Sequence, residues 1–302
     1  MNNKSLDKLA SMKKNFQIHS TAVLAPGVKI GENVVIEPYV VINSPHVVIE
    51  DNVTIKSHVY IDGYTTVGSG TTIYPSAVIG TKTQDLKYQG EKTYVKIGKN
   101  CDIREFVTIN SSCQENSSVE IGDRCLIMAY CHVAHNCTIG NGVIMVNNAT
   151  LAGHVTIEDY AIIGSMTPIH QFTRVGRNAM VGGMSRVTHD IPPFTIGAGI
   201  PYKFGGLNII GLKRHGFPLE VRRELSKAFK LLYRSQMHFD DALDKIEKEL
   251  TPFPEIQHFI SFCRNSKRGL MGLQKLEDEL PQPEEEDDDS IFTHLNLISH
   301  PL

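Results

Sequence analysis

Aliphatic residues recur every six positions along most of this 302-residue chain. The register begins at Ile18 with IHSTAV, LAPGVK, IGENVV and IEPYVV, and it resumes after a one-residue shift near Pro45. It then runs from Ile121 to about Pro192 almost without a break. An aliphatic first place, often followed by Gly, Ala or an acidic residue, is the hexapeptide signature of a parallel β-helix. The pattern therefore predicts a β-helix over residues 18–200.

Three hexads form one triangular coil, so residues 18 apart in the sequence lie on the same side of successive coils. The first-place Ile, Val or Leu side chains point inward and stack at about 4.8 Å, the spacing of neighbouring strands. Each buried side chain contributes roughly 1.5–3 kcal/mol before entropy is counted. One coil cannot bury its own faces, so stability requires many coils.

Two polar segments break the period and are predicted to project as loops, residues 81–96 and 110–120. Loops that a rigid scaffold positions often carry function. Helical spacing replaces the hexads further on, and it predicts a linker and a small C-terminal α-helical domain over 201–280. Residues 1–17 form an N-terminal extension, and the acidic run after Pro281 predicts a disordered tail over 281–302.

The net charge of −3 gives no sign of a nucleic-acid partner or of binding to a membrane surface. The first residues lack the apolar run of a secretory signal. No apolar stretch approaches the roughly 20 residues that a membrane span needs. We therefore expect a cytoplasmic protein without stable membrane insertion.

Four of the six cysteines fall at the fifth place of a hexad, which elsewhere holds small residues such as Val and Ala. They are predicted to be inward-facing core residues: Cys101, Cys125, Cys131 and Cys137. No CxxC pair exists, so we expect neither a metal site nor a cofactor.

The coil arithmetic brings several histidines to one ridge. His135 lies one coil below Gly153 and two coils below Gln171, because each step is 18 residues. His154 and His170 each lie one residue from this column, and His132 lies nearby on the preceding side of the coil. An outward histidine alone is more often an ordinary surface residue, but this convergence beside a projecting loop favours chemistry.

A histidine with a pKa near 6.5 can act as a general base, an effect worth about 10²–10⁴ in rate. A glycine on the next coil permits close approach to the backbone, so its N–H can stabilise an oxyanion. A base and an oxyanion donor together are what acyl transfer to a hydroxyl requires.

The segments HVAHNCTIG, NNATLAGHV, IGSMTPIHQF, QDLKYQGE and GLKRHGF resemble the UDP-N-acetylglucosamine 3-O-acyltransferase family, hexapeptide-repeat enzymes of the first step of lipid A biosynthesis. The similarity runs in order from Ile18 to about Leu270. It implies a left-handed β-helix and a homotrimer with active sites between neighbouring subunits. It also implies an acyl carrier protein thioester, usually 3-hydroxyacyl, as the donor and the 3-hydroxyl of UDP-N-acetylglucosamine as the acceptor.

The resemblance also implies roles for individual residues. His135 would be the general base, and the Gly153 N–H would stabilise the oxyanion. The sugar and acyl cleft would be lined by Asp85, Lys87, His132, His154, His170 and Gln171, and the nucleotide would be approached by Asn208 and Arg214. Met180 and Gly183 match the family's acyl-chain ruler, and the open Gly183 favours a chain of about fourteen carbons.

The chain departs from the family pattern at three positions. Asn136 follows the base where relatives often have Asp, and Ile210 replaces an acidic ribose contact. His215 replaces a second Arg beside the nucleotide. An amide can hydrogen-bond an imidazole, but it does not stabilise the imidazolium by charge.

Four alternatives remain open at the level of sequence. The acceptor could be a 3-amino UDP-sugar. The later N-acyltransferase of the same pathway carries a uridine-binding domain before its β-helix, whereas about 17 residues precede the repeat here. A γ-carbonic-anhydrase-like enzyme would need three histidines around zinc across subunits. The last alternative is a non-catalytic trimeric scaffold.

Overall fold

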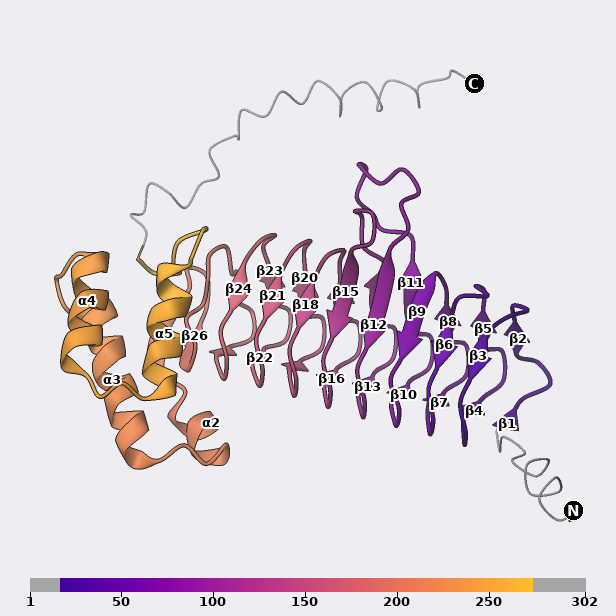
Figure 1. Ribbon diagram of the computed structural model, residues 1–302, viewed down its shortest axis with the longest axis horizontal. Coiled ribbons are helices and arrows are strands. Elements are labelled where there is room, and N and C mark those ends of the chain that lie inside the picture. The colour runs from indigo at the N-terminus through magenta and orange to yellow at the C-terminus, as the bar shows by residue number, and fades with distance from the viewer. Residues whose placement is uncertain (1–16, 274–302) are drawn as a thin grey trace, which may run out of the picture. The chain divides into compact units, whose positions relative to one another are not determined.

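The computed structural model describes residues 17–273, in which short parallel strands wind into a β-helix (Figure 1). From β1 to β25, consecutive strands enter three sheets in turn, here named A, B and C, and neighbouring strands of one sheet are three places apart along the chain. Sheet A has 11 strands, and sheets B and C have 8 each. The turns between sheets form three edges of the coil, which we name the A–B, B–C and C–A corners.

The strands are short, and most contain two residues. Sheet A consists of β1 (Gln17–Ile18), β4 (Val35–Ile36), β7 (Thr54–Ile55), β10 (Thr72–Ile73), β13 (Asp102–Ile103), β16 (Leu126–Ile127), β19 (Ile144–Met145), β22 (Ile162–Ile163), β25 (Met180–Val181), β26 (Thr195–Ala198) and β27 (Lys203–Leu207). Sheet B consists of β2 (Val23–Leu24), β5 (Val41–Ile42), β8 (Tyr60–Ile61), β11 (Val78–Thr81), β14 (Thr108–Asn110), β17 (His132–Val133), β20 (Thr150–Leu151) and β23 (Pro168–Ile169). Sheet C consists of β3 (Lys29–Ile30), β6 (Val48–Ile49), β9 (Tyr64–Val67), β12 (Tyr94–Ile97), β15 (Ser118–Ile121), β18 (Thr138–Ile139), β21 (Thr156–Ile157) and β24 (Arg174–Val175).

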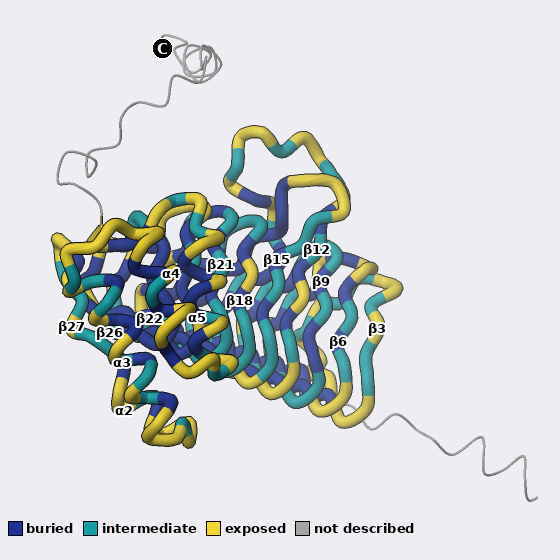
Figure 2. Tube along the Cα trace, turned by 60° about the vertical axis from the view of Figure 1, so that its left-hand side comes forward, coloured by how far each residue is buried: buried dark blue, intermediate teal, exposed yellow. Residues whose placement is uncertain are grey.

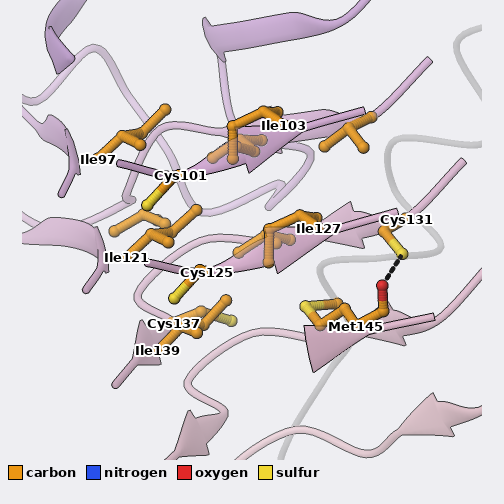
Figure 3. Close-up of a cluster of buried hydrophobic side chains, with 14 of the residues drawn as sticks. Ile97, Cys101, Ile103, Ile121, Cys125, Ile127, Cys131, Cys137, Ile139 and Met145 are labelled. Carbon is orange, nitrogen blue, oxygen red and sulfur yellow. Dashed lines mark hydrogen bonds between the residues drawn. The ribbon is translucent and has the colours of Figure 1, made fainter. Parts of the chain in front are cut away.

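The hexad period explains both the strand length and the core. The first-place residue of each hexad is the inward residue of its strand, and nearly all of these residues are buried (Figure 2). Figure 3 shows the resulting ladder, in which Ile97, Ile121 and Ile139 stack from coil to coil. The four fifth-place cysteines lie in the same core, as predicted, and each is at most 2% exposed.

The fourth place of most hexads adopts a left-handed backbone, with φ near +60° at Tyr130, Asn136 and His154. This conformation turns the chain sharply from one sheet to the next and directs the side chain outward. It disfavours most residues and suits Asn and Gly best. The same conformation recurs at the fourth place of nearly every hexad.

Two loops leave the coil where the period breaks. One connects β11 to β12 and the other connects β14 to β15, so both arise at the B–C corner (Figure 1). Figure 2 shows that the outer parts of the projecting segments are largely exposed.

Beyond the last coil, β26 pairs in parallel with β25 and antiparallel with β27. Four helices follow: α2 (Ile209–Arg214), α3 (Leu219–Arg234), α4 (Phe239–Glu249) and α5 (Pro254–Arg264). Helical spacing predicted the last three, whereas the short α2 had no such signal. The four helices enclose a second hydrophobic core that includes Phe194, Leu225 and Phe259. Among the described residues, no helix is long and apolar enough to cross a bilayer.

The predicted domain boundaries stay a prediction. The acidic tail lies outside the described residues, and so does the N-terminal extension apart from Gln17.

Candidate active site

The B–C corner brings together most of the residues that the sequence singled out. The loop with Asp85, the loop with Cys113, and the turns at His135, at His154 and at His170 occupy this corner on five successive coils. Paired strands keep the register, since His132 lies opposite Thr150 and Thr150 opposite Pro168. The spacing of 18 residues therefore holds through the site.

The His135 ring packs against the backbone of Gly153. A Cβ atom at position 153 would lie 2.3 Å from His135 Cε1 and 2.4 Å from Nε2, closer than any real contact. Only glycine leaves room for this imidazole. Within the described part of the chain, the Gly153 N–H has no hydrogen-bond partner, whereas its carbonyl accepts from the Phe172 N–H at 3.1 Å. A donor beside the imidazole is therefore available to a ligand.

Asn136 orients the His135 ring. Its side-chain oxygen lies 3.0 Å from His135 Nδ1, and an amide oxygen can only accept, so this bond requires the proton on Nδ1. The Nε2 atom then carries the lone pair that a general base needs. The same oxygen accepts from the Cys113 N–H at 3.3 Å and from its thiol at 3.0 Å. The amide thus fixes both the ring and the loop above it.

Asp85 approaches the other nitrogen of the ring, with Oδ2 3.7 Å from His135 Nε2. Burial alone would raise the pKa of Asp85, but the Lys87 N–H, the charge of His135 and the Cys113 thiol together lower it. The Lys87 N–H donates to Asp85 Oδ1 at 2.8 Å, whereas the Lys87 side chain is exposed. The site therefore places a carboxylate beside the imidazole.

His132 and His154 flank this centre. Burial lowers the pKa of His132, whose Nδ1 lies 2.7 Å from the Thr108 hydroxyl. Burial and the nearby charge of His135 lower the pKa of His154. The His154 ring meets the His135 ring edge-on at 5.2 Å and stacks on Phe172 at 4.6 Å. Both shifts favour neutral imidazoles.

His170 and Gln171 occupy the next coil and are exposed. Within residues 17–273, the one side-chain hydrogen bond of this pair is local, since His170 Nδ1 lies 3.2 Å from the Gln171 carbonyl oxygen. Both side chains are therefore accessible to a ligand along the ridge.

The predicted nucleotide residues lie at a different corner. Asn208 is buried, accepts from the Gly211 N–H at 3.0 Å to begin α2, and donates to the Asn178 carbonyl at 3.0 Å. Asn178 belongs to the C–A corner, and its side chain lies 2.5 Å from His215 Nδ1. Arg214 is exposed at the end of α2. Within one chain, the coil therefore separates Arg214 and Asn208 from the His135 corner.

The predicted ruler residues lie at the third corner. Met180 is in β25 of sheet A, and the exposed Gly183 follows it in the turn toward sheet B. A Cβ atom at Gly183 would lie 3.0 Å from Ser165 Oγ and 3.2 Å from the Ser165 carbonyl oxygen. The three predicted groups of site residues thus occupy three different corners of one chain.

Sequence reasoning missed Cys113. Its sulfur lies 3.4 Å from His135 Nδ1, and burial followed by the Asp85 charge raises the pKa of its thiol to about 11. Coil arithmetic could not place it, because the loop interrupts the count. One feature of the sequence could have drawn attention to it: Cys113 lies in the polar loop rather than at the fifth place of a hexad.

Comparisons with known proteins identify the relatives of this chain. Residues 190–271 match the family described as UDP N-acetylglucosamine O-acyltransferase, domain 2, and residues 10–44 and 118–153 match the bacterial transferase hexapeptide family. An acyl-[acyl-carrier-protein]–UDP-N-acetylglucosamine O-acyltransferase from Chlamydia abortus is 60% identical over 254 residues, which are 84% of this chain and 91% of the relative.

Solved structures agree as well. A UDP-N-acetylglucosamine acyltransferase from Bacteroides fragilis superposes with a TM-score of 0.82 at 42% identity, covering 84% of this chain and 99% of that one. The enzyme LpxA from Acinetobacter baumannii gives a TM-score of 0.81 at 37% identity, covering 84% and 99%. The chain therefore belongs to the UDP-N-acetylglucosamine O-acyltransferase family and has its left-handed parallel β-helix, as the motifs predicted.

Proposed function

We propose that the protein transfers an acyl chain from acyl carrier protein to the 3-hydroxyl of UDP-N-acetylglucosamine, the first step of lipid A biosynthesis. The carrying observation is the contact between the oriented His135 ring and the Gly153 backbone, whose N–H is free within the described residues. The family relationship favours this reaction over a 3-amino acceptor and over a zinc hydratase.

The geometry supports a direct transfer. His135 Nε2 takes the proton of the 3-hydroxyl while that oxygen attacks the thioester carbonyl. The Gly153 N–H stabilises the resulting oxyanion. The C–S bond then breaks, and the leaving thiolate takes the proton from the imidazolium. Asn136 holds the ring, and Asp85 lies where a carboxylate can stabilise the imidazolium or accept from the sugar.

A homotrimer with sites shared between subunits would unite the three groups. Within one chain, Arg214 and His135 lie at different corners of the coil. A cleft that uses both residues therefore needs a second copy of the chain. Exposed apolar side chains follow the A–B corner, and this column is suited to burial against another subunit: Tyr39, Phe106, Tyr130, Met166 and Met184. Phe106 stacks on Tyr130 with ring centroids 5.0 Å apart.

A basic stripe on α3 is suited to the acidic surface expected of the carrier protein. Arg223, Lys227, Lys230 and Arg234 are exposed and follow one another at helical spacing. Of these, Lys227 pairs with Glu224 at 2.6 Å. Reversing the Lys230 charge should raise KM for the carrier-bound donor but not for an acyl-pantetheine thioester, which lacks the protein. Equal KM changes for both donors would contradict docking on α3.

The direct test is product analysis. Purified protein is incubated with UDP-N-acetylglucosamine or its 3-amino analogue and a panel of carrier protein thioesters, and products are identified by mass spectrometry. We expect a 3-O-acyl product. Acylation of the amino sugar alone would transfer the proposal to that acceptor, and no product with either acceptor would refute acyl transfer.

Shared sites are tested by mixing subunits. His135→Ala and Arg214→Ala chains are co-expressed, purified together and assayed below the wild-type KM for the nucleotide sugar. If each cleft draws on two chains, some clefts in mixed trimers carry both intact residues and regain turnover. A mixture no more active than the two separate variants would contradict sharing.

A further inference from the structure

The side chains around His135 form a set that the proposed transfer does not use as a whole. Cys113, His135 and His154 each offer one ligand atom, and these atoms all lie within 4.8 Å of one another. Among residues 17–273 this is the one group of three or more His, Cys, Asp or Glu side chains with such spacing. The acyl transfer proposed above gives the Cys113 sulfur no task.

The ligand types and distances suit zinc. Zinc binds Cys sulfur at about 2.3 Å and His nitrogen at about 2.0–2.1 Å, so tetrahedral ligand atoms lie about 3.5 Å apart. Cys113 Sγ and His135 Nδ1 are already 3.4 Å apart. The third ligand atom needs a closure of about 1 Å, which rotation of the half-buried His154 side chain can supply.

A fourth donor is nearby, and within residues 17–273 no Lys or Arg side chain forms an ion pair with it. Asp85 Oδ2 lies 3.7 Å from His135 Nε2, and carboxylate oxygen completes many zinc sites. The Lys87 side chain is exposed, and its contact with Asp85 is through the backbone N–H.

We infer that Cys113, His135 and His154 bind a thiophilic divalent cation such as Zn²⁺, and that the bound ion inhibits the enzyme. On binding, the Cys113 thiol gives its proton to solvent and the thiolate coordinates the metal. Coordination through His135 Nδ1 replaces its hydrogen bond to Asn136 and moves the ring proton to Nε2. The Nε2 atom then has no lone pair with which to accept a proton from the acceptor hydroxyl. The ion is thus an inhibitor and not a cofactor, and this second half of the inference rests on the proposed function.

Binding is measured first, without substrate, so that it does not depend on acyl transfer. The metal-free protein is titrated with Co²⁺, whose bond to thiolate gives a charge-transfer band in the near ultraviolet, and Zn²⁺ is then added to displace it. We expect about one equivalent per chain, loss of the band in Cys113→Ser, and an apparent Kd for Zn²⁺ at least about tenfold weaker. His238→Ala, at an exposed histidine far along the chain, is the matched control and should keep the band.

Inhibition is measured second, with each variant compared with its own metal-free rate. The Zn²⁺ concentration for half inhibition should rise at least about tenfold in Cys113→Ser and stay unchanged in His238→Ala. A missing thiolate band, or equal Zn²⁺ affinity in wild type and Cys113→Ser, would overturn the site. A bound metal with undiminished turnover would overturn the inhibition. If the wild type transfers no acyl group at all, the proposed function fails while the cobalt titration still decides the site.

Discussion

Polar residues have different partners at two corners of the same coil. At the C–A corner, side-chain oxygens bind backbone N–H groups of the preceding coil: Asp123 accepts from Lys99, Asn141 from Asp123, and Asp159 from Asn141, at 2.6–2.8 Å. At the B–C corner, Asp85 and Asn136 also accept from backbone N–H groups, but both side chains contact the His135 ring as well. The side chains at the C–A corner satisfy backbone N–H groups of the fold. Those at the B–C corner surround an imidazole that can contact a ligand.

The comparison shows that a polar residue at a corner is not by itself a functional signal. His46 also lies at the B–C corner, where it stacks on Tyr64 with ring centroids 4.2 Å apart. It differs from His135 in its neighbours, because no loop residue contacts it in the way that Cys113 and Asp85 contact His135 within the described chain. The loops that leave the coil therefore distinguish His135 from His46 at this corner.

The largest expected effect comes from His135→Ala. Turnover should fall by at least about a hundredfold, because the proposed general base is lost while the buried ladder keeps its volume. Urea unfolding and the oligomeric state should remain close to wild type. His46→Ala is the matched control at the same corner and should keep its turnover. A near-normal kcat in His135→Ala would contradict the hypothesis that His135 is the general base.

Gly183→Met tests whether the A–B corner measures the acyl chain. The backbone of Gly183 does not need a positive φ, so a side chain is tolerated once Ser165 gives way. Each buried methylene contributes roughly 0.8 kcal/mol, so a chain four carbons shorter should gain by about a hundredfold in relative kcat/KM. Donors of about fourteen and about ten carbons are compared on carrier protein.

Gly183→Ala is the control for the ruler and should shift the preference less, because its methyl group projects less far. A Gly183→Met enzyme that keeps its turnover and its preference for the longer donor would show that the groove does not end there.

Asp123→Ala tests the C–A corner. In contrast to His135→Ala, it should lower the free energy of unfolding and leave turnover nearly unchanged. It leaves the Lys99 N–H without its acceptor, which costs about 1–2 kcal/mol at a corner that water can partly reach. The free energy of unfolding is measured in urea, and kcat should stay within about twofold of wild type. A large loss of turnover with unchanged stability would erase the distinction between the corners.

Much of the fold and part of the site could be predicted from the sequence, for one physical reason. The hexad period fixes the register of every coil, so residues 18 apart stack, and the pairing of His135 with Gly153 followed from arithmetic. The predictions of the family and of the fold class are confirmed. The roles of the individual site residues stay predictions.

The features that the sequence could not predict lie where the hexad repeat does not fix the path of the chain. Cys113 lies in a loop whose path depends on tertiary contacts, among them those with Asn136. At Asn136 the sequence predicted only that a charged partner of His135 is missing. The structure adds that its left-handed φ of 57° suits Asn, and that its side-chain oxygen orients the imidazole. The capping of α2 by Asn208 likewise depends on helix geometry that the hexads do not encode.

The smallest expected effect is a pH dependence of stability that originates at the B–C corner. Burial lowers the pKa of His132 in the folded protein, so the folded state binds fewer protons than the unfolded chain. The free energy of unfolding should therefore fall as the pH drops through the ordinary histidine value of about 6.5 toward the lower folded pKa. His132→Gln keeps a polar partner for Thr108 and removes the titration, so its unfolding free energy should fall less between about pH 7.5 and about pH 5. Protein concentration is held fixed, because unfolding of an oligomer depends on it. A variant with the full wild-type slope would mean that His132 is not a source of the acid sensitivity, and that its burial has no cost for the charged form.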